Sequence, residues 1–472
     1  MVFSSIVFLG MFLPASLILY FIIPNRAWRN YILLAVSLVF YAWGEPVWVL
    51  AMIALALVDY LGGLLLPRIP EGAGRKAFLI ALVTLNLLLL FLFKYCNFLL
   101  ENVGSLLQWI GIQNVKMPVF PFRMPIGISF FTFQALSYAL DVSRGTTKPQ
   151  KNYFYLLLYI AMFPQLIAGP IVRYTDVETE ILHRRETPKG FADGGFRFCL
   201  GLGKKVILAN YAGSLATTLL TDRLSTLSSA GAWIGIVMYT AQIYFDFSGY
   251  SDMAIGLGRM FGFHYRENFN YPYIARSVTD FWRRWHISLS SFFRDYVYIP
   301  LGGNRRHQYL NIFIVWALTG LWHGASWNFM LWGLFYAVLL VIEKSLSRAN
   351  VDTGKIPIIS SALLLIIVMY GWAIFYYTDL SQLGVFTKAL LGLGESVVSI
   401  SLKELTAVNQ FFWLIPAMVL GATPLPAKLG NRLFAGKTLE PLVKTVWALA
   451  ILAVSFTLIL NQSYNPFLYF RF

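Results

Sequence analysis

Long apolar runs recur from one end of this chain to the other, and they limit the folds that it can adopt. The clearest runs are Ile6–Ile23, Tyr31–Trp43, Val47–Val58, Phe78–Phe93, Tyr153–Ala168, Ile234–Phe245, Ile356–Tyr377 and Val446–Leu460. Runs of about 20 residues are typical of helices that cross a bilayer, and runs of about 10–14 are typical of buried or re-entrant helices. Because both lengths occur, we predict an all-α polytopic membrane protein with roughly ten to twelve crossings and several short helices that enter without crossing.

The charged residues agree with this class. They make up 12% of the chain, whereas an average soluble domain has about 25%. The net charge is +15, but the basic residues flank apolar runs, so positive-inside bias and anionic lipid headgroups explain most of them. The same distribution argues against a nucleic-acid-binding protein. The two cysteines, Cys96 and Cys199, provide neither a disulfide framework nor a set of four metal ligands.

The start of the chain has no basic segment and no clear small-residue cleavage site, so we expect the first run to remain as a membrane anchor. Arg26 and Arg29 follow this run, and a second basic group surrounds Arg75. By the positive-inside rule both groups are cytoplasmic, which predicts an extracytoplasmic N-terminus. The absence of linkers and internal repeats indicates a single membrane domain over residues 1–472.

One histidine lies alone in a long apolar segment. No Lys, Arg, Asp or Glu occurs from Gln308 to Ile342, so only His323 can titrate there near neutral pH. A charged side chain at membrane depth costs roughly 2.5 kcal/mol or more, and such an ionisable residue indicates a functional site. Imidazole is also the side chain best suited to move a proton near pH 7. We therefore predict that function depends on His323.

A second histidine lies in the polar segment 277–300. Ser277 and Asp280 resemble a capping box, which predicts one continuous helix from there to about Ile299. On this helix His286 and Ser290 would lie four residues apart, away from an apolar stripe, and line an interface or cavity. The stripe consists of Phe281, Trp285, Leu289, Phe292 and Tyr296.

Arginine is the only basic residue type, histidine aside, between residues 266 and 306. The planar guanidinium group suits phosphate and carboxylate, so a phosphate-bearing thioester such as a coenzyme A compound is a suitable ligand. Lipid phosphates are the alternative partners for many of these side chains. The seven arginines are Arg266, Arg276, Arg283, Arg284, Arg294, Arg305 and Arg306.

Two aspartates follow an apolar run. Asp246 is expected to be either buried and paired or at a water-filled cavity, where it could orient an imidazole or brace a helix break. Asp252 is predicted to cap a helix that begins near Ser251 and runs through Met260.

Metal chemistry is not expected. A zinc site made from His286 and His323 would lack a third ligand, and no His-Glu-x-x-His motif occurs. The other histidines, His183, His264 and His307, lie in polar segments and are predicted to be solvated. Nucleophile-elbow, P-loop and dinucleotide glycine motifs are absent as well.

Several motifs resemble those of one known family. They are Pro125–Gln134, Phe163–Arg173, Tyr244–Asp252, Asn268–Tyr273, Phe281–Ser290, Arg294–Gly303 and Trp322–Trp332. Their ordered combination resembles the membrane-bound O-acyltransferase (MBOAT) family over nearly the whole chain. The closing segment Pro466–Phe472 is similar to the bacterial branch typified by the alginate O-acetyltransferase membrane subunit.

The resemblance implies a ring of helices around a thinned centre in a bacterial cell membrane. A cytoplasmic donor path and an outward acceptor path would meet at the histidines, within a catalytic segment of about residues 240–335. The essential histidine of the family falls on His323 and its second polar position on His286.

Acyl transfer from a thioester to a hydroxyl is the chemistry so implied, with acetyl-CoA as co-substrate, no tightly bound cofactor and an extracytoplasmic polysaccharide or partner protein as acceptor. A hydroxyl needs a base within reach, and we assign His323 to this role. His286 would orient the donor or stabilise the oxyanion together with Asn328 or backbone N–H groups. The donor phosphates are assigned to Arg276, Arg283 and Arg284, and supporting roles to Asp246, Trp322 and Ser290. An acyl-histidine intermediate would use the same histidines.

Two other functions remain open. A D-alanyl transferase of the same family would use a carrier-protein thioester, which also presents phosphopantetheine. A secondary transporter would place Asp246 and histidines at the midplane, but it predicts two related halves. The two histidine segments have no counterpart before residue 240, and a non-catalytic scaffold would leave His323 unexplained.

Overall fold

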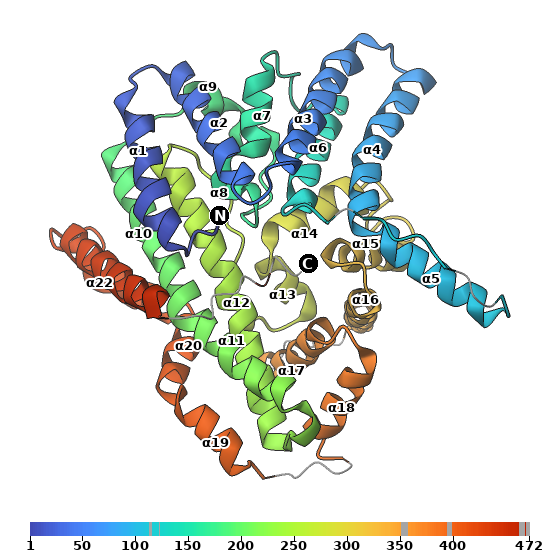
Figure 1. Cartoon of the computed structure of the whole chain (residues 1–472), viewed down its shortest axis with the longest axis vertical. Coiled ribbons are helices and arrows are strands. Elements are labelled where there is room, and N and C mark those ends of the chain that lie inside the picture. The colour runs from blue at the N-terminus through green and yellow to red at the C-terminus, as the bar shows by residue number, and fades with distance from the viewer. Residues whose placement is uncertain (113–115, 122, 351–356, 394–398, 462–467, 469–472) are drawn as a thin grey trace. The chain divides into compact units, whose positions relative to one another are not determined.

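A computed structural model describes residues 1–112, 116–121, 123–350, 357–393, 399–461 and 468 of the chain. Within these ranges every regular element is an α-, 3-10 or π-helix and no strand occurs (Figure 1). The all-α prediction is confirmed. The chain divides into two compact units, one of residues 1–191 and 258–266, the other of residues 192–257 and 267–472. The prediction of a single domain depends on how these units associate and stays a prediction.

The first unit holds the helices before residue 191. They are η1 (Phe8–Phe12), α1 (Leu13–Ile22), α2 (Arg26–Ala42), α3 (Trp48–Leu65), η2 (Leu66–Arg68), α4 (Ala73–Lys94), α5 (Cys96–Trp109), α6 (Ile128–Ser143), α7 (Tyr153–Ala161), α8 (Phe163–Leu166) and α9 (Tyr174–His183). Helix α6 packs against α3 and α4, and α7 packs against α2 and α3.

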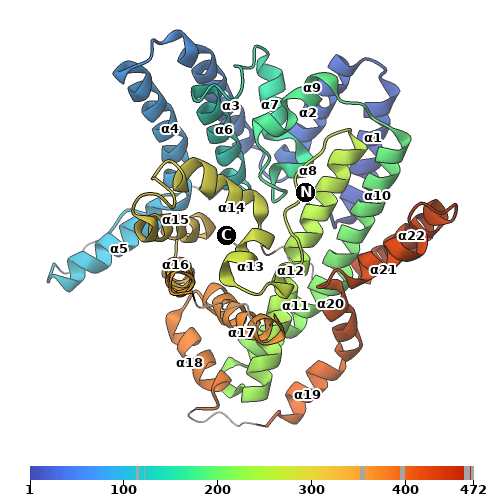
Figure 2. The same cartoon turned by 180° about the vertical axis from the view of Figure 1, so that it is seen from behind.

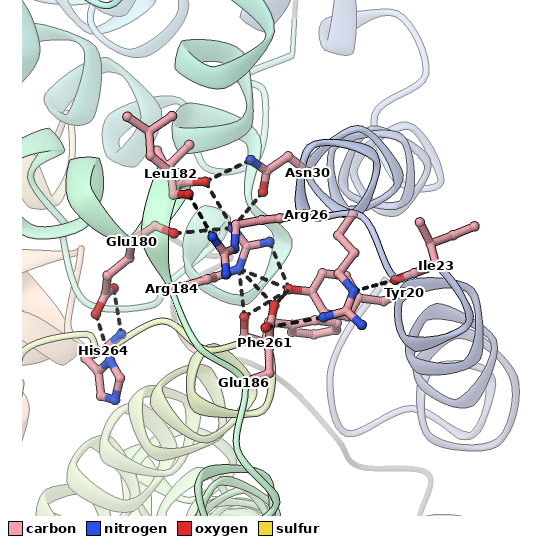
Figure 3. A network of polar contacts seen from close by, with 12 residues as sticks. Tyr20, Ile23, Arg26, Asn30, Glu180, Leu182, Arg184, Glu186, Phe261 and His264 are labelled. Atoms are coloured by element: carbon pink, nitrogen blue, oxygen red, sulfur yellow. Dashed lines mark hydrogen bonds and ion pairs between the residues drawn. The ribbon is translucent and has the colours of Figure 1, made fainter.

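A buried arginine joins several segments of the first unit (Figure 3). Arg184 follows α9, and its guanidinium group donates to the Tyr20 hydroxyl at 2.8 Å and to Asn30 Oδ1 at 2.6 Å. It also donates to the Phe261 carbonyl at 3.0 Å and pairs with Glu186 at 3.4 Å. Burial alone would raise the pKa of Glu186, but the Tyr20 hydroxyl and the nearby arginines outweigh burial and lower it. The ionised pair therefore holds the segment after α9 against α1 and α2.

The second unit begins within α10 (Pro188–Gly203) and contains most of α12 (Ser229–Met260). Its other helices are η3 (Lys204–Ala209), α11 (Asn210–Thr217), η4 (Thr218–Asp222), η5 (Leu224–Thr226), η6 (Pro272–Ile274), α13 (Val278–Arg284), α14 (Ile287–Phe293), η7 (Arg294–Tyr298), α15 (Gln308–His323), α16 (Trp327–Arg348), α17 (Pro357–Tyr376), α18 (Leu380–Leu390), α19 (Leu402–Asn409), η8 (Phe412–Leu414), α20 (Ile415–Gly421), α21 (Leu425–Phe434) and α22 (Glu440–Asn461). Helix α16 packs against α13, α15 and α17 (Figures 1 and 2).

Five helices in the described ranges are long and apolar enough to cross a membrane. A sixth is counted if the pair α20 and α21, bent by 70°, forms one span. This number is lower than the ten to twelve crossings predicted, because several apolar runs fold as shorter pieces. The run from Tyr153 to Ala168, for example, is divided at Met162 into α7 and α8. The five are residues Trp48–Arg68, Ala73–Lys94, Trp327–Arg348, Pro357–Tyr376 and Glu440–Asn461.

Candidate functional site

His323 is the last residue of α15, where the chain turns into α16. The two helices approach closely because Gly320 has no side chain: a Cβ atom there would lie 2.4 Å from the Phe329 carbonyl oxygen. The His323 side chain is buried, and its ring packs edge-on against Trp332 and Phe375, with centroids 4.9 and 5.1 Å away. A buried imidazole among aromatic rings agrees with the environment that its apolar segment predicts.

A small cavity in the second unit has His323 in its wall. The cavity has a volume of about 20 Å³, which is room for about one water. Most of the wall is aromatic or aliphatic, and Asp246 is the one carboxylate among the described residues that form it. The lining residues are Ile243, Asp246, Phe247, Trp285, His323, Trp372, Phe375 and Leu468.

Asp246 is both buried and paired, and it lies at this cavity. Its Oδ1 atom is 2.7 Å from Lys205 Nζ, and its Oδ2 atom accepts a hydrogen bond of 2.8 Å from the Leu468 N–H. The side chains of Asp246 and Lys205 are 2% and 3% exposed, so each charge depends on the other. Of the two alternatives considered for Asp246, bracing a helix break is excluded, because α12 continues through this position.

Lys205 was not among the residues predicted for the site. Lys204 and Lys205 interrupt an apolar segment that runs from Phe198 to Ala209. A lysine in such a position indicates an ion pair or a functional site. This pair of lysines could have predicted a buried cation, but no sequence pattern identifies Asp246 as its partner.

The helix predicted from Ser277 to Ile299 is broken in the middle. Ser277 caps α13 as predicted, since its hydroxyl accepts from the Asp280 N–H at 3.1 Å. However, α13 ends at Arg284, and His286 has φ 46° and ψ 54°, in the left-handed region. The continuous helix, and with it the alignment of His286 with Ser290, was therefore a wrong prediction.

A neighbouring loop causes the break. The Asn268 carbonyl accepts from the Ile287 N–H at 3.0 Å, and the Asn270 N–H donates to the Arg284 carbonyl at 2.9 Å. These bonds satisfy backbone groups that a continuous helix would have paired internally. Residues of the apolar stripe remain buried on both sides of the break, with Phe281 and Trp285 before it and Leu289 and Phe292 after it.

His286 lies one side chain away from His323. Its ring is 4.6 Å from the Phe247 ring and 5.7 Å from the Trp322 ring, and Trp322 is in turn 5.0 Å from the His323 ring. Trp322 is buried and its ring packs against both histidine rings, while its supporting role stays a prediction. Burial lowers the pKa of His286 to about 3, so its imidazole is neutral at physiological pH.

The side-chain amide of Asn328 binds backbone carbonyls at the end of α17. This amide donates to the Ile374 and Phe375 carbonyls at 3.3 and 3.1 Å. Since both amide hydrogens are used in this way, Asn328 braces the end of α17 beside His323, and the geometry does not support its predicted contact with an oxyanion. Ser290 is half-buried in α14, where its N–H donates to the His286 carbonyl at 3.0 Å.

The predicted donor-binding arginines differ in how they are engaged. Arg276 and Arg283 are exposed at the two ends of α13. Arg284 forms an ion pair of 2.8 Å with Asp280 and donates to the Asn270 carbonyl. The exposed pair is therefore better placed to meet a solvated anion than Arg284 is.

Asp252 does not cap a helix. It lies inside α12, where it pairs with Arg197 at 2.8 Å and with Lys204 at 2.6 Å. The capping prediction is wrong because the apolar run before Asp252 and the segment after it form one helix.

The remaining histidines are exposed, as predicted. His264 is paired with Glu180 at 2.7 Å in the first unit, and His183 and His307 lie on the surface. Among the residues that the structure describes, no three His, Cys, Asp or Glu side chains form a group that could hold a metal ion.

Comparison with known proteins identifies the family. The model of the membrane-bound O-acyltransferase family matches residues 76–377, which include both histidines, the exposed arginines and every residue in the cavity wall except Leu468. The chain belongs to this family. It is a multi-pass membrane acyltransferase, and the resemblance first seen in its motifs is confirmed.

Several members of the MBOAT family align with the chain. It is 38% identical to the "Probable alginate O-acetylase AlgI" of Azotobacter vinelandii, over 100% of both chains. It is 30% identical to the peptidoglycan O-acetyltransferase of Helicobacter pylori, over 100% of this chain and 98% of the relative. A teichoic acid D-alanyltransferase of Bacillus subtilis is 29% identical over 49% of this chain and 62% of its own length.

Proposed function

We propose that this MBOAT protein transfers an acetyl group from acetyl-CoA, on the cytoplasmic side, to a hydroxyl group on the other side of the membrane. The acceptor is a polysaccharide such as alginate or peptidoglycan, or a partner protein that passes the acetyl group on. The names of the relatives aligned over the whole chain support this acceptor class. The observation that carries the proposal is the buried His323 in the wall of a small, largely apolar cavity.

His323 acts as the general base. Its unprotonated ring nitrogen takes the proton of the attacking hydroxyl while the hydroxyl oxygen bonds to the thioester carbonyl carbon. The carbon–sulfur bond then breaks, and the coenzyme A thiolate leaves and takes up the proton. The largely apolar wall of the cavity at His323 leaves room for about one water, which limits hydrolysis of the thioester.

The charges at the cavity favour acetyl over D-alanyl. A D-alanyl group carries an ammonium ion, which would need an acidic partner when buried. Among the described residues that line the cavity, Asp246 is the one acidic side chain, and Lys205 Nζ lies 2.7 Å from it. D-Alanyl transfer remains the second candidate because of the Bacillus subtilis relative.

The donor phosphates are assigned first to Arg276 and Arg283, which are exposed. Arg284 contributes only if it leaves its ion pair with Asp280. The protein needs no tightly bound cofactor for this chemistry, because the thioester supplies the activated acyl group.

Transfer of radiolabelled acetyl from acetyl-CoA, by the purified protein in nanodiscs with a short oligosaccharide acceptor, tests the proposal. Wild type should label the acceptor, and His323→Ala should reduce labelling to background while the protein still accumulates in the membrane. His307→Ala, at an exposed histidine, is the matched control and should behave as wild type. Full activity of His323→Ala would overturn the assigned base, and transfer of D-alanyl but not acetyl would select the second candidate.

A further inference from the structure

We propose that Asn268 is a positioning residue that holds His286 as the tautomer protonated on Nδ1. His286 then presents Nε2 as a hydrogen-bond acceptor for an N–H or O–H group of a substrate. The inference rests on the proposed function only in placing His286 at the site of acyl transfer. The tautomer itself follows from hydrogen bonds that do not depend on any substrate.

Three donors surround a single side-chain oxygen of Asn268. Its Oδ1 atom lies 3.1 Å from His286 Nδ1, 2.8 Å from Ser288 Oγ and 3.2 Å from the Ser288 backbone nitrogen. A backbone N–H can only donate, so the Asn268 atom that faces it is the carbonyl oxygen and not the amide nitrogen. His286 Nδ1 meets this same oxygen and must therefore carry the proton.

The amide end of Asn268 is held as well. Its Nδ2 atom donates to Ser251 Oγ on α12 at 3.1 Å. The residue before it, Glu267, forms an ion pair with Arg197, and Arg197 also binds Asp252, next to Ser251. The side chain of Asn268 is thus held at both ends, and its orientation toward His286 is fixed.

Asn268 also holds the backbone of His286. Its carbonyl oxygen accepts from the Ile287 N–H at 3.0 Å, directly after the left-handed residue. A histidine with positive φ is strained and persists where surrounding contacts impose it, commonly at functional sites. The same residue therefore sets both the backbone and the ring of His286.

The tautomer decides between the two roles considered for His286. Burial lowers its pKa to about 3, so the ring is neutral, and with Nδ1 protonated its Nε2 atom has a lone pair and no hydrogen. Such a ring cannot donate a hydrogen bond to an oxyanion. Its Nε2 atom can accept a hydrogen bond, so His286 orients a substrate group that carries a hydrogen. This group is either the hydroxyl that receives the acyl group or an amide N–H of the pantetheine arm.

The tautomer can be measured without any assay of activity. Protein labelled with ¹⁵N-histidine in nanodiscs is compared with its His286→Gln variant, and the resonances that disappear belong to His286. We expect a protonated Nδ1 and an unprotonated Nε2 at pH 7.5. A protonated Nε2, or a doubly protonated ring, would overturn the inference.

Variants of Asn268 give a second, independent readout. Asn268→Leu removes the acceptor and should produce a mixture of tautomers and a fall in kcat of about tenfold or more. Asn268→Asp keeps an acceptor and should restore the Nδ1-protonated ring, but its carboxylate favours the imidazolium and raises the pKa of His286. The proposed role requires an unprotonated Nε2. As the pH is lowered, the activity of Asn268→Asp should therefore begin to fall at a higher pH than the activity of wild type does.

The matched control is Asn461→Leu, at an exposed asparagine whose amide donates to its own helix, and it should leave both readouts unchanged. A pH profile of Asn268→Asp equal to that of wild type would contradict the proposed contact. If wild type shows the expected tautomer but transfers no acetyl group, the proposed function fails and the inference stands. If it transfers acetyl with Nε2 protonated, the inference alone fails.

Discussion

At the scale of single residues, three buried polar contacts of the second unit have defined partners. Asp246 pairs with Lys205, Asn268 binds His286, and Asn328 holds the end of α17. A polar side chain without a partner in such surroundings would cost about 1–3 kcal/mol, and a charge would cost more. These pairs therefore identify the positions where one substitution should have a large effect.

Lys205→Met should destabilise the protein by about 3–5 kcal/mol, because it leaves the buried Asp246 carboxylate without its cation. Thermal unfolding in detergent measures the loss, with Lys403→Met at an exposed lysine as the control. The double variant Lys205→Met with Asp246→Asn should recover a large part of the stability. A double variant as unstable as the single one would contradict the pairing.

The pH dependence of stability should include a contribution from His286. Its pKa is about 3 in the folded protein and about 6.5 in an unfolded chain, so the unfolded state binds an extra proton between these values. Stability should therefore fall as pH drops from about 6.5 toward 3, by on the order of 1–2 kcal/mol at pH 5. Melting curves at pH 7.5 and 5 should differ less for His286→Gln than for wild type, and an equal difference would exclude the contribution.

At the scale of elements, close helix packing positions the site. Helices α15 and α16 approach at Gly320, and α10 and α12 approach at Gly201, where a Cβ atom would lie 2.5 Å from the Gly249 carbonyl oxygen. Because the short distances involve backbone atoms, a neighbouring side chain cannot relieve them by rotating. The position of His323 at the end of α15 thus depends on a residue one helical turn before it.

Gly320→Ala should lower the free energy of unfolding by about 1–3 kcal/mol and reduce transfer, because the added methyl group pushes α15 away from Phe329. Gly430→Ala, in the exposed helix α21 with no atom within 4 Å of the new Cβ, is the matched control. That variant should be neutral or more stable by up to about 1 kcal/mol. Similar losses at both positions would show that packing is not the cause.

At the scale of the whole molecule, the chain joins apolar helices long enough to cross the bilayer with a larger number of short or broken ones. The distribution of basic residues is the available guide to orientation. We expect the N-terminus outside the cytoplasm, and the turn before α4, which contains the highly exposed Glu71, inside it.

A cysteine placed at residue 71, after both native cysteines are replaced by serine, should react with a membrane-impermeant maleimide only when cells are broken. A cysteine added before Met1 should react in intact cells. Reversed labelling of the two positions would reverse the proposed orientation.

The sequence by itself determined the all-α class and the family. Apolar runs predict helices because helix formation and membrane burial depend on local composition, and Ser277 begins α13 because capping needs only residues three apart. The isolation of His323 in an apolar run also predicted its burial without a structure.

Only the tertiary structure decided how that site is completed. The helix breaks at His286 because residues 268–270, distant in sequence, bind its backbone, and local periodicity contains no information about them. Lys205 and Asp246 form a pair across two elements for the same reason. Hydrogen bonds and ion pairs between distant segments form where the fold brings those segments together. A local sequence pattern contains no information about which distant segments will meet.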